Sequence, residues 1–328
     1  MKKSFLGILF VLFAVFFWGI SFVSTKIVLT GIPPVSIAFF RQFIALVPLI
    51  ALMLLRKESF HLSRGDLKLF FIAALFGIVL YFVFENNGLT LTSASNASML
   101  VAAIPIFTLI IEGISNHKRM SVASLGCILA SFLGVFCIIF EKGVIDLNSK
   151  VFIGNLLVFG AMASWIIYTF LSKNLGKRYS SLKLTTIQSF LSIPLFTPFI
   201  IAEIPTWHVP SMAVIGNLVF LGVFCSGIAY VFFLYSLQTM GPVLPSAFLN
   251  LIPVVTIITG MIVLSEKLSL IQIAGAVLIV GSLTLLSLMK LRERNSLLKS
   301  AIESHMPLSK DIPLEVTEFS PSENEHLR

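Results

Sequence analysis

Four charged residues of this 328-residue chain lie within or at the ends of its apolar runs, and they are the first candidates for chemistry. They are Lys26, Arg41, Glu85 and Glu112. A charge at the centre of a membrane helix costs about 2.5–3.5 kcal/mol on insertion scales, so each of them is a candidate for function. The planar guanidinium of Arg41, with Lys26 nearby, suits a substrate carboxylate or phosphate. Glu85 would neutralise part of this positive charge.

A structural role is the alternative for the same charges. Arg41 would pair with Glu85 and lock two helices together, and the long side chain of Lys26 would reach the lipid headgroups. We expect this surface position for Lys26, whereas both roles stay open for Arg41. Glu112 and His117 lie near the other membrane surface and are too isolated for acid–base chemistry.

Aromatic side chains at mid-depth form a second group of candidates. Trp18 and Trp165 are each the fourteenth residue of an apolar run, where a broad ring can line a cavity and stack on a substrate. Packing against lipid or neighbouring helices is the alternative, and we favour cavity lining. The weaker candidates are Tyr81, Tyr168, Tyr230 and Gln188.

Pro105 and Pro253 interrupt two further apolar runs. A proline frees a carbonyl of the preceding helical turn, and polar groups or water must then satisfy it. We therefore expect these two runs to line the pathway, unless the prolines only kink the helices for packing. Four polar residues lie within about three turns of the prolines: Asn96, Ser98, Ser246 and Asn250.

Membrane helices must position these residues. The chain is 57% hydrophobic and 12% charged, whereas soluble proteins are roughly 45–50% apolar and about 25% charged. One span needs about 20 apolar residues, and the apolar runs predict an all-α polytopic membrane protein with ten spans. These cover residues 5–28, 35–55, 67–85, 92–112, 121–140, 152–172, 184–202, 212–235, 243–264 and 269–289.

The basic residues predict the orientation of the spans. With the N-terminus inside, sixteen Lys and Arg fall in inner segments, and only Lys142, Lys150 and Lys267 fall in outer ones. We therefore expect a multi-pass protein of the cytoplasmic (plasma) membrane with both termini in the cytoplasm. The net charge of +8 then reflects topology and not nucleic-acid binding. Residues 300–328 are polar, and we expect a disordered cytoplasmic tail there.

An internal repeat divides the chain into two units of five predicted spans, residues 5–140 and residues 152–289. Because five is an odd number, the second unit enters the membrane from the opposite side. Such inverted repeats are typical of secondary transporters. When the two units are aligned, the matches between rare residue types are Trp18 with Trp165, 147 residues apart, and Pro105 with Pro253, 148 residues apart.

Four motifs carry a resemblance to a known family. They are Phe17-Trp18-Gly19-Ile20-Ser21-Phe22, Phe40-Arg41-Gln42-Phe43, Thr92-Ser93-Ala94-Ser95-Asn96-Ala97 followed by Pro105, and Ser265-Glu266-Lys267-Leu268-Ser269. Their order and spacing resemble the EamA-type transporters of the drug/metabolite transporter superfamily, over about residues 5–289. The resemblance implies a ten-helix carrier of small organic metabolites with a cavity between its halves. The chain departs from the family at Lys118, where a Glu is often found.

Catalytic and nucleotide-binding motifs are missing from the sequence. It has no H-E-x-x-H and no G-x-S-x-G, and Gly176-Lys177 has Leu171 where a P-loop needs its first Gly. We therefore expect a protein that is not an enzyme and holds no cofactor or metal. The expected function is secondary transport of an amino acid or similar metabolite by alternating access, in the direction of export.

Two other functions remain open. A membrane-embedded enzyme acting on lipid-linked substrates would need acid, base or metal-binding residues at the water–lipid boundary. A channel would need polar rings along several helices, and the predicted spans contain few polar residues. The expected partners are a small-molecule substrate and the lipid bilayer, without nucleic acid. A stripe of Gly126, Ala130 and Gly134 allows close helix approach, which we expect within one chain, with a homodimer as the alternative.

Overall fold

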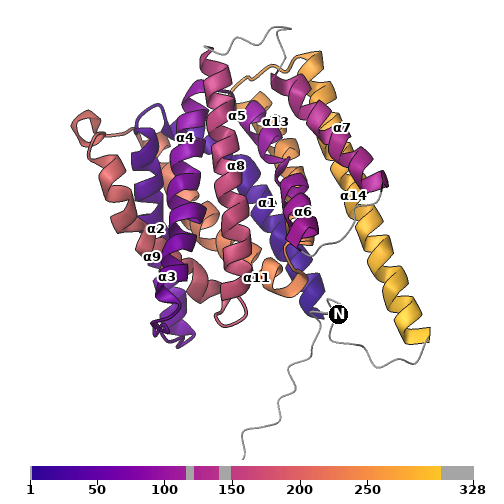
Figure 1. The fold of residues 1–328 in the computed structure, drawn as a ribbon. Helices are drawn as coiled ribbons and strands as arrows, with labels where there is room; N and C mark the ends of the chain where they lie inside the picture. The colour runs from indigo at the N-terminus through magenta and orange to yellow at the C-terminus, as the bar shows by residue number, and fades with distance from the viewer. Residues whose placement is uncertain (1, 116–121, 140–148, 304–328) are drawn as a thin grey trace, which may run out of the picture.

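The fold is a bundle of helices (Figure 1). The computed structural model describes residues 2–115, 122–139 and 149–303, and all regular elements in these ranges are helical. The first half contains α1 (Lys2–Val28), α2 (Pro34–Leu55), α3 (Leu67–Ala74), η1 (Leu75–Leu80), α4 (Tyr81–Leu91), α5 (Ala94–Val101), α6 (Ile104–Ser115) and α7 (Val122–Ile139). The second contains α8 (Lys150–Leu175), α9 (Ser181–Ile200), η2 (Ile204–Thr206), α10 (Met212–Phe220), η3 (Leu221–Ile228), α11 (Ala229–Met240), α12 (Val243–Phe248), η4 (Leu249–Leu251), α13 (Ile252–Val263) and α14 (Leu270–Glu303).

Six helical segments of the described chain are long and apolar enough to cross a membrane. They are Phe5–Val28, Pro34–Leu55, Leu67–Leu91, Lys150–Leu175, Met212–Met240 and Leu244–Val263. Three shorter apolar helices accompany them, over Ala94–Thr108, Leu125–Ile138 and Leu270–Leu286. The all-helical polytopic fold expected from the composition is therefore present. Of the predicted tail, residues 300–303 belong to the last helix and residues 304–328 lie outside the described part of the chain.

The third predicted span is longer than its apolar run indicates. The helix continues to Leu91 instead of ending at Glu85, so Glu85 lies six residues inside it. Two amides that look like a polar break in the sequence donate hydrogen bonds within the bundle. The Nδ2 atom of Asn86 donates to the carbonyl oxygen of Pro34 at 2.8 Å, and that of Asn87 donates to Val83 at 2.7 Å.

Two spans contain a π-helical segment in their middle. The segment η1 joins α3 to α4, and η3 joins α10 to α11. π-Helical turns are rare and frequently occur at functional sites. Tyr81 directly follows η1, and Tyr230 is the second residue after η3.

Two other spans are broken close to Pro105 and Pro253, the prolines that interrupt apolar runs in the sequence. The first is interrupted at Ala102 and Ala103, and the second at η4. In both cases the break precedes the proline, since Pro105 is the second residue of α6 and Pro253 the second residue of α13. A proline fits the first helical turn because the amide hydrogen that it lacks would have no partner there.

Segments far apart in the sequence pack side by side. Helix α1 lies against α11 and α13, α4 against α8, and α2 against α9. At one edge of the bundle α7 runs along α14 (Figure 1). There a Cβ atom on Gly134 would meet the carbonyl oxygen of Gly275 at 2.6 Å, so the two backbones need glycine to approach. Part of the small-residue stripe thus packs within the chain, whereas a Cβ atom on Gly126 would meet no other part of the described chain within 4 Å.

Candidate functional site

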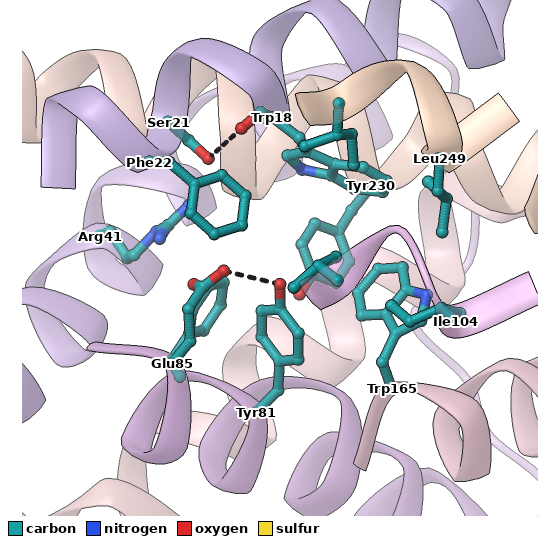
Figure 2. Close-up of a pocket in the computed structure, with 13 residues that line it drawn as sticks. Trp18, Ser21, Phe22, Arg41, Tyr81, Glu85, Ile104, Trp165, Tyr230 and Leu249 are labelled. Carbon is teal, nitrogen blue, oxygen red and sulfur yellow. Dashed lines mark hydrogen bonds between the residues drawn. The ribbon is translucent and has the colours of Figure 1, made fainter. Parts of the chain in front are cut away.

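A cavity at the centre of the bundle brings together six of the candidates from the sequence, the charged residues Arg41 and Glu85 among them (Figure 2). About 390 Å³ between its side chains is free of protein atoms, a volume that includes open solvent. Each lining side chain is at most 9% exposed. The lining residues are Trp18, Ser21, Phe22, Arg41, Tyr81, Phe82, Glu85, Val101, Ile104, Trp165, Tyr230, Leu249 and Ile252.

Arg41 brings a buried cation into this cavity from α2. Its side chain is 1% exposed, and its Nε donates to the Oγ of Ser226 in η3 at 2.7 Å. The guanidinium carbon lies 4.1 Å from the centre of the Phe82 ring, a cation–π contact. Among the described residues no acceptor binds the two terminal amino groups of Arg41. These two groups are therefore available to a ligand.

Glu85 is the carboxylate of the cavity. The hydroxyl of Tyr81, one turn earlier in α4, donates to its Oε1 at 2.7 Å, and the side chain is 5% exposed. Arg41 and Glu85 enter the cavity on the same side (Figure 2). They form no ion pair, since the one pair within 4.0 Å in the described part of the chain joins Arg178 to Asp66. The interhelical Arg41–Glu85 lock is thus not formed.

Aromatic rings cover the other side of the cavity. The rings of Trp18 and Trp165 meet edge to face with centroids 5.2 Å apart, and the Tyr230 ring lies 5.6 Å from each. The Nε1 of Trp18 donates to the main-chain oxygen of Cys225 at 3.0 Å. The buried Nε1 of Trp165 has no acceptor among the described residues, so it can donate to a ligand or to water. The two tryptophans that match in the repeat therefore face each other.

Tyr168 does not line the cavity but supports it. Its hydroxyl donates to the Oε1 of Gln188 at 3.3 Å, and its ring lies on Gly77 of η1. The hydroxyl of Tyr230 donates to the carbonyl oxygen of the same Gly77 at 3.0 Å. The π-helical segment thus fixes one aromatic ring of the lining and packs on another behind it.

Asn96 connects two helices outside the cavity. Its Nδ2 donates to the Oδ1 of Asn155 in α8 at 2.7 Å and to the hydroxyl of Thr92 at 2.8 Å. Asn250, in η4, is 2% exposed, and neither polar atom of its side chain has a partner within the described residues. It does not line the cavity, so the amides near the broken helices are separate from the central site.

The broken helices contribute apolar residues to the lining in place of the expected polar ones. These are Val101, Ile104, Leu249 and Ile252. Pro253 is buried in α13, and the side chain of Pro105 lies outside the described part of the structure. Sequence reasoning also missed Phe82 and Ser226, which contact Arg41. No pattern in the sequence indicates them, because Ser226 lies within a π-helical segment and Phe82 lies just after one, and such segments shift the helical register.

Replacing Gly77 with alanine is expected to lower the melting temperature by several degrees. The added Cβ would lie 2.1 Å from the Tyr168 ring, and such overpacking costs about 1–3 kcal/mol. Gly216 in α10 is the matched control, because a Cβ there meets no atom within 4 Å. Thermal unfolding of both variants in detergent measures the effect. Equal melting temperatures would show that Tyr168 does not need this contact.

Comparisons with known proteins agree with this architecture. Residues 5–140 and 152–288 match the model of the EamA-like transporter family. An uncharacterized transporter of Archaeoglobus fulgidus is 32% identical over 264 residues, covering 80% of this chain and 92% of its own. The uncharacterized transporter YoaV of Bacillus subtilis is 26% identical over 281 residues, covering 85% and 94%.

The fold also resembles a solved protein. A crystal structure of 18% sequence identity superposes with a TM-score of 0.64 over 89% of this chain and 98% of its own. The resemblance stated from the motifs is confirmed by the family model. With its apolar helices, the chain is an integral membrane protein of the transporter type. It belongs to the EamA-like transporter family, in the drug/metabolite transporter superfamily.

Proposed function

We propose that the chain is a secondary transporter of a small zwitterionic metabolite, an amino acid with an apolar side chain being the simplest example. The observation that carries the proposal is a central cavity holding Arg41 and Glu85 without an ion pair between them. In the proposed complex the substrate carboxylate binds the two free amino groups of Arg41, and the substrate ammonium group binds Glu85. The apolar part of the substrate packs against Trp18, Trp165 and Tyr230.

Burial of the two charges supports this assignment. An ion removed from water costs several kcal/mol unless it is paired and hydrogen-bonded. Within the described residues Arg41 keeps two unused amino groups, and Glu85 accepts one hydrogen bond, from Tyr81. A zwitterion brings one partner for each of them in a single molecule. Bidentate binding of a carboxylate by arginine also fixes the orientation of the ligand.

Ten membrane spans in two inverted units of five are the proposed topology, with residues 5–140 and 152–289 as the units. Matched irregularities support it. The π-helical segments start 146 residues apart, at Leu75 and Leu221, and the two broken spans are interrupted near residues 102 and 249. Rocking of one unit against the other would open the central cavity to each side in turn.

The excess of basic residues in the predicted inner segments supports cytoplasmic termini and the plasma membrane as the location. Export is the proposed direction of transport. A second copy of the chain beside the open face at Gly126 is the proposed candidate for a protein partner.

Reconstitution into liposomes tests the function. Labelled amino acids and nucleosides are offered under imposed pH or voltage gradients, with protein-free liposomes as the control. The expected result is saturable uptake of an apolar amino acid, with weak competition by analogues that lack either the carboxylate or the amine. Ion current without substrate would indicate a channel, chemical conversion would indicate an enzyme, and either result would overturn the proposal.

A further inference from the structure

Glu266 caps a helix of the other half of the chain. It lies in the connection between α13 and α14, and it accepts hydrogen bonds from the first turn of α5. The main-chain nitrogen of Ala94 donates to its Oε1 at 2.9 Å. The main-chain nitrogen and the hydroxyl of Ser95 donate to its Oε2 at 3.0 and 2.5 Å. The carboxylate thus accepts three hydrogen bonds.

Glu203 repeats this arrangement at the start of α2. Its Oε1 accepts from the main-chain nitrogen of Val35 at 3.0 Å. Its Oε2 accepts from the main-chain nitrogen and the hydroxyl of Ser36, both at 2.7 Å. The Nε1 of Trp207 donates to the same hydroxyl at 2.7 Å. Both carboxylates therefore bind two successive amides and a serine hydroxyl.

These two carboxylate caps, Glu203 and Glu266, join the second half of the chain to the first. The first amides of a helix have no partner within the helix, and the helix dipole favours a negative charge there. Hydrogen bonds to a charged acceptor are about twice as strong as neutral ones. One capped helix carries Arg41 and the other carries Val101, so both caps act on helices that line the cavity.

The opposite end of the bundle is held by a different kind of contact. Asp66 pairs with Arg178 at 2.7 Å and accepts from the hydroxyl of Tyr179 at 2.8 Å. The side chain of Arg178 is 57% exposed and that of Asp66 is 6% exposed, so water screens one partner of this pair and weakens it. Ser180 donates to Glu58 through its hydroxyl. In the described part of this end, no carboxylate binds two successive helix amides.

We propose that the two carboxylate caps hold the pathway closed at the α2 and α5 starts, and that their release opens the cavity toward that side. This inference rests on the proposed alternating access. Separating the halves at this end must break up to six hydrogen bonds to charged acceptors, and the balance between closed and open states follows the free energy of those bonds. The caps are thus positioning residues that act on Arg41 and Val101 through their helices.

Thiol labelling tests the caps without any substrate. Ser21 lines the cavity at 8% exposure. It follows Trp18 in α1 and so lies nearer to the end of that helix. A short connection leads from there to the capped start of α2. A Ser21→Cys reporter is exposed to a membrane-impermeant maleimide in right-side-out vesicles, and the same variants without the reporter give the background from native cysteines. E203Q and E266Q are each expected to raise the labelling rate about tenfold, and the double variant further.

Glutamine is the substitution of choice because it changes the charge of the side chain and keeps its size. It removes the charge and turns an NH₂ group toward a backbone N–H, so at least one hydrogen bond is lost at each cap. Asp66→Asn is the matched control at the opposite end, and it is expected to leave labelling from this side unchanged. If a Glu variant fails to fold, Ser36→Ala and Ser95→Ala remove one hydroxyl each and are expected to raise labelling by a smaller factor.

Unchanged labelling in folded cap variants would overturn the inference, and so would an equal rise in Asp66→Asn. Neither result depends on transport. If the cap variants raise the labelling rate but the protein transports no amino acid, the proposed function alone is overturned. If the protein transports zwitterions but the cap variants leave the labelling rate unchanged, this inference alone is overturned.

Discussion

Replacing Arg41 with lysine is expected to lower amino-acid uptake about tenfold to a hundredfold at equal amounts of folded protein, the range that the loss of one or two charge-assisted hydrogen bonds gives. Lysine keeps the positive charge but lacks the planar fork that binds a carboxylate at two points. It also loses the bond from Nε to Ser226 and the stacking of the guanidinium on Phe82. Initial rates in proteoliposomes over a range of concentrations measure the change, and we expect it mainly in the apparent affinity.

Arg56→Lys is the matched control for this prediction. Arg56 is the C-cap residue of the same helix, and it is exposed. The same substitution there is expected to leave uptake within about twofold, since an exposed charge contributes little. Uptake retained by Arg41→Lys would show that the guanidinium serves helix packing and does not bind the substrate. The proposed carboxylate site would then be wrong.

Scarcity of charge made part of the site predictable from sequence. Trp18, Arg41, Glu85, Trp165 and Tyr230 were singled out by residue type and depth, and all five line one cavity although they come from five helices. The spans contain few polar groups, so a charged residue at mid-depth must lie inside the bundle with the few others, and a tryptophan there can join them. The membrane thus restricts the candidates more than a soluble core would.

Helix register was not predictable in the same way. Apolar runs give no sign of a π-helical turn, so the sequence did not indicate that Phe82 would reach Arg41 or that Tyr168 would lie behind the lining. The end of the third span was not predictable either. An asparagine reads the same in the sequence whether its side chain faces water or, like that of Asn86, donates to a neighbouring helix. Such partners are tertiary and leave no local pattern.

Long-range capping was missed for the same reason. In the sequence Glu266 stands out only as part of a motif, and Glu203 belongs to no motif. Their partners lie 167 to 172 residues away in the sequence. A serine near the start of a helix predicts capping by its own side chain, whereas a carboxylate supplied from the other half of the chain depends on how the two halves pack.

Replacing Glu85 with glutamine is expected to weaken amino-acid binding about tenfold to a hundredfold, while the same compound without its amino group binds as before. An amide has the shape of the carboxylate but cannot neutralise an ammonium group, so the loss should fall on zwitterions alone. Calorimetric titration of each variant with the paired ligands measures the difference.

Tyr81→Phe is the matched control for the Glu85 variant, because it removes the hydrogen bond to Oε1 and keeps the charge. We expect it to weaken binding of both ligands by a similar, smaller factor. An equal loss of both ligands in Glu85→Gln would mean that Glu85 supports the position of Arg41 and does not bind the amine. A loss confined to the zwitterion would instead place the two ends of the substrate on Arg41 and Glu85, since no other carboxylate lines the described cavity.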